Sequence, residues 1–249
     1  PAKHNFNSNP FLNAVSPVER VSTAFFADYA LTDGIQAFGE FLYTFRKSNQ
    51  IATPGTLRNL SIPASNPTNP TGQNLVLAQR RLAEPGARHF FQETDTWQGT
   101  FGLRGKLAND WAWEVAGSFG RNTAVDGSTN IANLERVRNT INTSICSSAP
   151  TAAIPCGDYL GYGDLTPQVL NYILFTSRDR GGNQLGTVTA DLNGKLFDLP
   201  AGPLSFATGV VYRKEKGWRD PDPLTVLGIA NTNQQSPISG SSIAKEAYL

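Results

Sequence analysis

The sequence predicts an all-β fold, an antiparallel transmembrane β-barrel segment of six to seven strands whose long loops contain short helices. Three observations lead to this prediction: paired runs of alternating apolar and polar residues, short turns within each pair, and much longer connections between the pairs. A period of two residues is typical of strands with one apolar face. Short turns on one side and long loops on the other are typical of membrane barrels.

The clearest pair of strands covers residues 96–122 and is interrupted by a turn at 108–110. Its apolar face carries Trp and Phe, whereas its polar face carries Arg, Lys, Glu and small residues. Near the strand ends lie Trp97, Trp111 and Trp113. Amphipathic indole rings form the aromatic girdles of membrane barrels, but three such rings could also form the core of a soluble sheet.

The first hairpin is expected over residues 18–31 and 35–46, around a turn at 32–34. Three apolar side chains fall on its polar face: Phe26, Phe38 and Leu42. A water-filled lumen would disfavour them, whereas a lumen filled by a folded domain would accommodate them.

The third hairpin is expected over residues 187–196 and 204–213, with a turn at 197–202. A last strand is expected to begin at Ile243. Long connections at 47–93, 123–185 and 214–242 separate the hairpins, and the first of them shows no clear period. Tight turns between neighbouring strands require antiparallel pairing, which excludes a βαβ arrangement.

Two helices are expected within the second connection. The apolar spacing over residues 130–142 is helical. Residues 165–177 have Thr166 at the N-cap and Pro167 at the first helical position, where both residue types are favoured.

Composition bounds the class of protein. The 249 residues carry a net charge of +1, which gives no electrostatic argument for nucleic-acid binding. No apolar run approaches the roughly 18 residues of a membrane helix, and barrels do not need one because alternation dilutes the hydropathy of each strand. The chain starts at Pro1 without a leader and stops within an apparent strand. We therefore expect residues 1–249 to be part of one barrel domain of a longer protein, and the missing leader says nothing about location.

Two cysteines, Cys146 and Cys156, lie in a polar segment between the expected helices. A local pair of this kind predicts a disulfide formed in an oxidising compartment. Two reduced thiols are the alternative. A zinc site would need further Cys or His ligands, which this segment lacks.

No catalytic, metal or cofactor site is predicted, and we expect the protein not to be an enzyme. His4 and His89 are far apart and have no partner pattern. Glu93 and Asp95 could be paired carboxylates, but we interpret them as solvated charges of a loop or lumen.

Candidate ligand-binding residues lie in the long connections. The basic cluster Arg80, Arg81 and Arg88 could bind an anion such as a siderophore, a phosphate or lipopolysaccharide. Aromatic residues assigned to loops could stack on a sugar or an aromatic ligand: Tyr159, Tyr162 and Trp218. The alternatives are a solvated basic loop and aromatic packing within the loops.

An ordered set of tracts resembles the barrel domain of the TonB-dependent outer-membrane receptors, from about residue 18 to the end. The tracts are ERVSTAFFADYALTD (19–33), NPTNPTG (66–72), RRLAEPGAR (80–88), GLRGKLANDWAWE (102–114), LPAGPLSFATGVVYRKE (199–215) and PD (221–222). No single tract is diagnostic, and the ordered set carries the resemblance. It implies a barrel of about 22 strands around an N-terminal plug, of which this chain would supply about a third.

The resemblance also implies a function and a location. A receptor of this family lies in the outer membrane of a Gram-negative bacterium, contacts lipid and lipopolysaccharide, and takes up a scarce solute such as a siderophore, vitamin or oligosaccharide. Its plug and TonB box, which we expect outside this chain, couple it to the TonB complex. Two alternatives remain open: a soluble secreted β-rich module that binds or cleaves glycans, and a passive porin.

A stability expectation follows from the predicted fold. The lone chain would have two open sheet edges and an exposed apolar face. We therefore expect that it does not fold as a soluble monomer.

Overall fold

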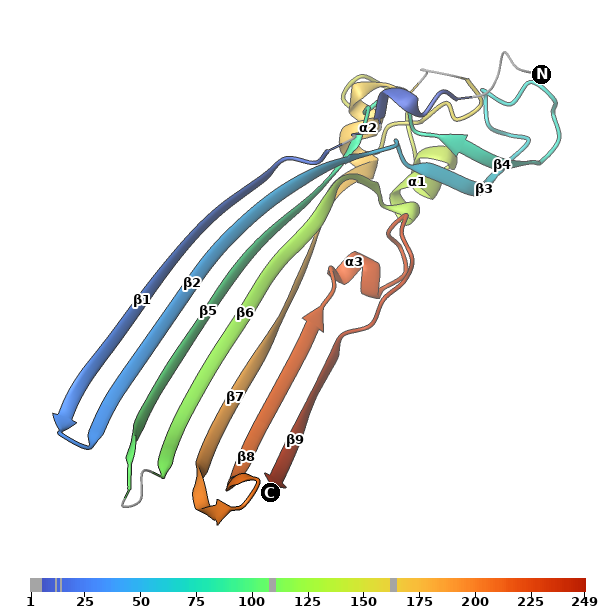
Figure 1. Cartoon of the computed structure of the whole chain (residues 1–249). Helices are drawn as coiled ribbons and strands as arrows, with labels where there is room; N and C mark the ends of the chain where they lie inside the picture. Colours follow the sequence, from blue (N-terminus) through green and yellow to red (C-terminus); the bar gives the residue numbers. More distant parts are fainter. Residues whose placement is uncertain (1–5, 12, 14, 108–110, 162–164) are drawn as a thin grey trace.

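A computed structural model describes residues 6–11, 13, 15–107, 111–161 and 165–249. Its main element is a seven-stranded antiparallel sheet in the order β1-β2-β5-β6-β7-β8-β9 (Figure 1). The all-β, antiparallel prediction is therefore confirmed. Strands β1 and β9 form two open edges, and the described residues do not close into a barrel, which remains a prediction.

The strands of this sheet are long. They are β1 Val18–Thr32, β2 Ile35–Ala52, β5 Arg88–Lys106, β6 Ala112–Ala132, β7 Leu174–Leu199, β8 Gly202–Asp220 and β9 Ile238–Tyr248. Most extend beyond the predicted ranges, because backbone hydrogen bonds to neighbouring strands continue where the side chains are polar. For the same reason β9 begins before the expected start at Ile243.

Short turns lie at one end of the sheet and long connections at the other (Figure 1). Residues 33–34 join β1 to β2, as predicted. Gly202 closes the β7–β8 turn with φ +133°, a backbone conformation that L side chains rarely adopt. The turn predicted at 108–110 lies outside the described residues.

The connection over residues 47–93, expected without regular structure, contains a two-stranded hairpin. Its strands are β3 Thr56–Ile62 and β4 Leu75–Arg81, and the connection also includes the ends of β2 and β5. Six cross-strand pairs link β3 to β4, although neither strand shows a simple alternation of exposure. This irregularity explains why the sequence pattern missed them.

Of the three α-helices within the described residues, two match sequence predictions, with shorter bounds. Helix α1 (Leu134–Ile141) is capped by the Asn133 side chain. Helix α2 (Pro167–Ile173) has Thr166 at its N-cap and Pro167 in its first turn, as predicted. It ends before the expected Ser177 because β7 begins at Leu174. Helix α3 (Pro223–Val226) was not predicted, and a 3-10 turn covers Asn9–Phe11.

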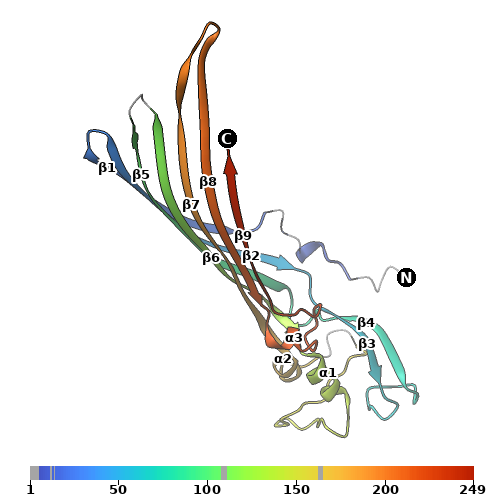
Figure 2. The ribbon, with the colours of Figure 1, turned by 90° about the horizontal axis from the view of Figure 1, so that it is seen from below.

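Most of the hydrophobic core lies outside the large sheet. We call the β3–β4 hairpin, α1, α2, the segments that join them and the end of β6 at Ala132 the loop cluster. Its buried apolar side chains are Leu57, Leu60, Ile62, Leu82, Ala132, Val137, Ile141, Tyr159, Leu165, Val169 and Ile173. In Figure 2 the curved sheet extends away from this cluster. Apolar side chains of the sheet are exposed, with Phe25 at 63% and Phe101 at 65%.

Candidate functional site

The register gives the sheet an apolar face and a polar face. For example, Phe25 is opposite Phe41, which is opposite Gly99, which is opposite Phe119. The apolar face carries aromatic and branched side chains on every strand up to β8, including Tyr29, Phe41, Tyr43, Trp97, Phe101, Trp113, Val188, Leu192, Val210 and Tyr212. The second and third predicted hairpins thus share one apolar surface with the first.

The apolar face has a boundary on the side of the loop cluster. On each strand the apolar run ends at a charged or amide residue of the same face: Glu19, Lys47, Asp95, Arg121, Gln184, Lys214 and Lys245. We call a set of residues that pair with one another across successive strands a row. The residues at the boundary do not lie in one row. The row of Glu19 on β1 reaches β8 at Asp220, whereas the apolar run on β8 ends six residues earlier in the chain, at Lys214.

This offset sets the tilt of the strands. Six residues span about 20 Å along a strand, and the five steps from β1 to β8 span about 24 Å across the sheet. The strands are therefore tilted by about 40° from the perpendicular to the boundary. A tilt of this size follows from the pairing register of the strands together with the chemistry of their side chains.

Many charges on the polar face are paired across strands. Arg104 contacts Asp28 at 2.7 Å, and its guanidinium lies 5.0 Å from the centre of the Phe38 ring. That ring lies over Gly102, where a Cβ would come within 2.4 Å of it. Farther along, Arg219 binds Asp179 at 2.6 Å and also Asp126, and Arg213 binds Glu215 and Glu246.

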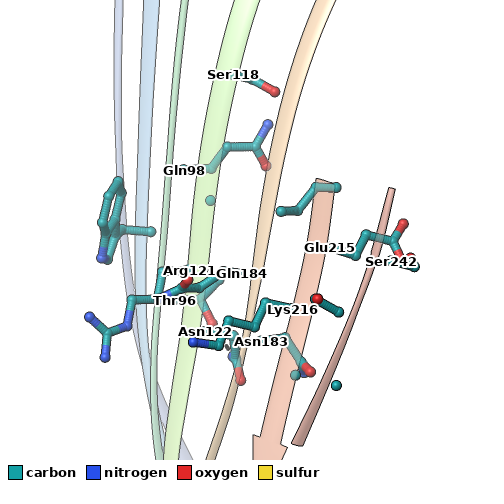
Figure 3. Close-up of a pocket in the computed structure, with 16 residues that line it drawn as sticks. Thr96, Gln98, Ser118, Arg121, Asn122, Asn183, Gln184, Glu215, Lys216 and Ser242 are labelled. Carbon is teal, nitrogen blue, oxygen red and sulfur yellow. Dashed lines mark hydrogen bonds between the residues drawn. The ribbon is translucent and has the colours of Figure 1, made fainter. Parts of the chain in front are cut away.

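A hollow of about 540 Å³ lies on this face, with side chains from β5 to β9 around it (Figure 3). Its lining combines amide and hydroxyl side chains, among them Gln98, Ser118, Asn122, Asn183 and Ser242, with apolar groups and the charged Arg121, Glu215 and Lys216. Amides both donate and accept hydrogen bonds, so the hollow can contact polar groups of a ligand or a polypeptide backbone. Sequence reasoning missed it, because the register alone brings these separate polar positions together.

The structure buries Arg80, predicted as a ligand residue, inside the loop cluster at 8% exposure. Its guanidinium pairs with the Glu84 carboxylate, donates to the Gly161 carbonyl at 3.1 Å and lies over the Tyr159 ring. Burial alone would raise the pKa of Glu84, but hydrogen bonds and the charge of Arg80 outweigh it and hold that pKa below its ordinary value. Arg80 therefore holds Glu84, Gly161 and Tyr159 together inside the loop cluster through these contacts.

Tyr159 is also part of the core and is 1% exposed. Its hydroxyl is hydrogen-bonded to the Thr140 hydroxyl at 2.7 Å. Burial raises the pKa of Tyr159 to about 12. Packing, the alternative raised for the loop aromatics, accounts for this side chain.

Arg81 and Arg88 lie at the border between the loop cluster and the sheet. Arg81 donates to the Pro54 carbonyl at 2.8 Å, and Arg88 donates to the Thr53 carbonyl at 2.9 Å. Arg81 and Arg88 thus lie close together at two adjacent carbonyls, whereas Arg80 is buried against Glu84, so the three arginines do not form one exposed cationic surface.

Trp218 was expected in a loop, and that assignment is wrong. It lies in β8, which runs to Asp220, and it belongs to the apolar face. The Arg121 guanidinium lies 5.6 Å from its ring centre. Tyr162 and His4 lie outside the described residues.

The predicted disulfide is confirmed: Cys146 and Cys156 are bonded, with their Cα atoms 4.9 Å apart. It closes a loop between α1 and Tyr159. The backbone of the closed segment is held as well, since the Cys156 N–H donates to the Ser147 carbonyl at 3.1 Å.

Glu93 and Asp95, interpreted as solvated charges of a loop or lumen, are exposed, but they lie in a strand and not in a loop. Both lie within β5 on the apolar face, beyond its boundary. Glu93 pairs with Lys47 at 2.9 Å, and Asp95 accepts a hydrogen bond from the Tyr43 hydroxyl. They were misplaced because β5 starts earlier than the apolar alternation does.

No family model, no curated protein and no solved structure matches this chain. Within the part of the chain that the structure describes, no cluster of His, Cys, Asp or Glu has an arrangement that could hold a metal ion. No helix among those residues is long and apolar enough to cross a membrane.

Proposed function

We propose that this chain is part of the β-barrel of an outer-membrane receptor that takes up a scarce solute by energy-coupled, TonB-dependent transport. The apolar face would contact lipid, the polar face would line the lumen, and the loop cluster would lie outside the cell. The energy-coupled part of the proposal rests on the family resemblance of the sequence tracts.

The tilted apolar band carries the membrane part of the proposal. Its slope of about 40° lies within the range of about 35–45° for strands of membrane barrels. On β2 the apolar face runs from Ile35 to Phe45, about 34 Å along the strand and about 26 Å along the perpendicular to the boundary. Membrane barrels have apolar bands about 25 Å tall, bordered by aromatic residues. Tyr43 and Trp97 lie beside this border.

The polar face favours a receptor over an open porin. Phe26 and Leu42 project from it, and they are 68% and 41% exposed. Apolar groups of this size would be left in water in an open channel, whereas a folded domain inside the barrel would cover them. The amide-rich hollow on the same face offers hydrogen bonds to such a domain or to a passing solute.

A soluble glycan-binding module fits the sheet less well. Such a module would leave a large apolar surface in water, and large exposed apolar patches are uncommon on soluble monomers. The loop cluster, by contrast, has a water-compatible surface over its own core and contains a disulfide, which suits the oxidising side of a membrane.

Site-specific labelling tests the proposed topology, because both cysteines of residues 1–249 are in the disulfide and an introduced cysteine would be the one free thiol of this part of the protein. In the protein expressed in its native membrane, Val76→Cys in the loop cluster should react with a membrane-impermeant maleimide on intact cells. Asp33→Cys at the turn end should react only after lysis. Phe101→Cys on the apolar face should stay protected by lipid until detergent is added.

Equal labelling of Phe101→Cys and Val76→Cys in intact membranes would contradict the lipid-facing assignment. The energy-coupled step has a separate test. Uptake by cells that lack the TonB complex should stop, and uptake that continues at the same rate would favour the porin.

A further inference from the structure

We propose that the solute carried by this receptor is an acidic oligosaccharide, which binds on the polar face of the sheet. Arg20 and Arg46 would bind its carboxylates, and the hollow beside them would bind its hydroxyl groups. This inference rests on the proposed receptor function and names the class of solute.

Arg20 and Arg46 are two cations of the polar face without a carboxylate partner. They lie directly opposite each other on β1 and β2, a position in which like charges destabilise a strand pair. Arg46 donates to the Gln92 amide oxygen at 2.8 Å. No carboxylate among the described residues forms an ion pair with either arginine. A carboxylate of a ligand would relieve their repulsion and would form charge-assisted hydrogen bonds with both guanidinium groups.

A third arginine in the same row shows what a neutralised cation looks like on this face. The row of Arg20 and Arg46 reaches β8 at Arg219, and Thr, Ala and Gly residues lie between Arg46 and Arg219. Arg219 binds Asp179 at 2.6 Å and Asp126 at 3.1 Å. The positive charge of the row is therefore balanced on β8 and unbalanced on β1 and β2.

The next row toward the turn end crosses the hollow of about 540 Å³. Gly217 and Gly240 are neighbours in this row, and the absence of side chains there leaves the hollow open. Around it, Gln98, Asn183 and Ser242 make no hydrogen bond through their side chains to another described residue (Figure 3). Amides and hydroxyls both donate and accept, as the hydroxyl groups of a sugar require.

The acidic group in the lining does not oppose an acidic ligand. Glu215 lines the hollow, but its carboxylate is paired with Arg213 at 3.3 Å. The hollow therefore offers uncharged hydrogen-bonding groups beside an unbalanced positive charge.

The dimensions fit a chain of sugar units better than a small anion. From Thr96 to Gly240 the row crosses four strand steps, which span about 19 Å. Arg46 lies one strand and two residues from Thr96, a separation of about 8 Å between Cα atoms. A carboxylate of an oligosaccharide can contact the arginines while its hydroxyls contact the hollow. Free phosphate would contact the arginines and leave the hollow empty.

The site is separate from the surface that we assign to a folded domain. In the first hairpin that surface is formed by Phe26, Phe38 and Leu42, which lie nearer the turn end. Arg46 is four residues beyond Leu42, about 14 Å along the strand. Between them lies Thr44, whose hydroxyl is hydrogen-bonded to that of Ser22 at 3.0 Å. The face is thus apolar where a domain would pack and polar where a solute would bind.

Calorimetric titration of the full-length protein in detergent with two acidic probes, digalacturonate and sialyllactose, tests the proposal. At least one acidic probe should bind at a single site, and galactobiose, the neutral analogue of digalacturonate, should bind about tenfold more weakly or less. Arg20→Gln with Arg46→Gln should weaken binding of the acidic probe by about tenfold or more. Gly240→Leu should weaken it without a change of charge, since a Cβ there meets no other atom within 4 Å and the larger side chain would fill the hollow.

The matched control is Lys214→Gln with Lys245→Gln. This pair removes the same charge from the opposite face, and it should leave binding within about twofold because distant charges are screened. Equal weakening by both double variants would overturn the site, as would unchanged binding in the arginine variant. Equal affinity for digalacturonate and galactobiose, or no binding of either acidic probe, would overturn the acidic class.

Two further outcomes would assign the arginines to another ligand and would also overturn the proposal. Displacement of the acidic probe by millimolar inorganic phosphate would identify a free-anion site. A lower melting temperature of the arginine variant, with no sugar bound by the unchanged protein, would assign the arginines to the folded domain. Failure of these titrations refutes only the solute class when the cysteine variants label as the proposed topology requires. A different labelling pattern refutes the receptor position as well.

Discussion

The loop cluster and the seven-stranded sheet differ in what covers their apolar side chains. The cluster buries them in its own core, whereas the sheet leaves them exposed. The cluster encloses Leu57, Val137 and Ile173 at 0% exposure, together with a buried Arg80–Glu84 pair. The sheet leaves large aromatic side chains uncovered and is joined internally by backbone ladders and surface pairs. The cluster carries its own core, whereas the sheet requires an apolar environment to cover one face.

This difference separates two sources of stability within one chain. Apolar burial contributes roughly 25 cal/mol per Å² removed from water, and the isolated sheet obtains little of it in aqueous solution. A substitution inside the cluster should therefore lower the stability of the cluster alone. Removal of detergent or lipid should instead destabilise the sheet. The predictions below test this separation, from the largest expected effect to the smallest.

The largest effect should come from removing the apolar environment altogether. In plain buffer the purified chain should give no cooperative thermal unfolding of strand structure, because its apolar face and both sheet edges remain uncovered. Addition of detergent or lipid should restore the strand signal in circular dichroism. A cooperative melt of a monomer in plain buffer would show that the sheet needs no membrane.

Within the cluster, Arg80→Ala should have the strongest effect, at about 3–5 kcal/mol, since it leaves Glu84 buried without its partner. Hydrogen exchange of the loop-cluster amides in the detergent-solubilised protein would measure it. Lys47→Ala removes a cation from the half-exposed pair with Glu93 and should leave that exchange unchanged. Equal effects of the two substitutions would show that the cluster has no core of its own.

Leu57→Ala should cost about 2–5 kcal/mol of local stability, because it opens a cavity in the cluster core. The matched change on the sheet is Leu196→Ala, at a side chain that is 49% exposed. It should leave protection of the cluster amides as it is. Loss of cluster protection in the Leu196 variant would mean that the two regions unfold together.

The pH dependence should be smaller and confined to the cluster. The folded pKa of Tyr159, about 12, lies above its ordinary value of 10.0, so its contribution of about 3 kcal/mol is complete below pH 10 and is lost toward pH 12. The pKa of Glu84 is lowered, so its contribution is present above about 4.5 and is lost as the pH falls further. Tyr159→Phe should remove the alkaline loss of amide protection and keep the acid loss. An unchanged alkaline profile would exclude Tyr159 as the cause.

The sequence predicted the hairpins better than the site. Alternation located the apolar face in all three hairpins, and Thr166 with Pro167 located the start of α2. The β3–β4 hairpin was missed because its exposure pattern is irregular. Arg80 and Tyr159 were selected as ligand residues because a sequence shows residue type without burial, and Trp218 was assigned to a loop because polar strand ends look like loops.

By itself, the sequence determined the strand pairs, their two faces, the location of two short turns and the local cysteine pair, because each depends on residues close in the chain. The turns are tighter than predicted, at 33–34 and 200–201, because the strands continue into the ranges 32–34 and 197–202. The tertiary structure decided what distant segments do together. The register aligned the ends of seven apolar runs into a slanted boundary, gathered amides from separate strands and placed Gly217 beside Gly240. The physical reason is that a cross-strand contact depends on register, which no single strand encodes.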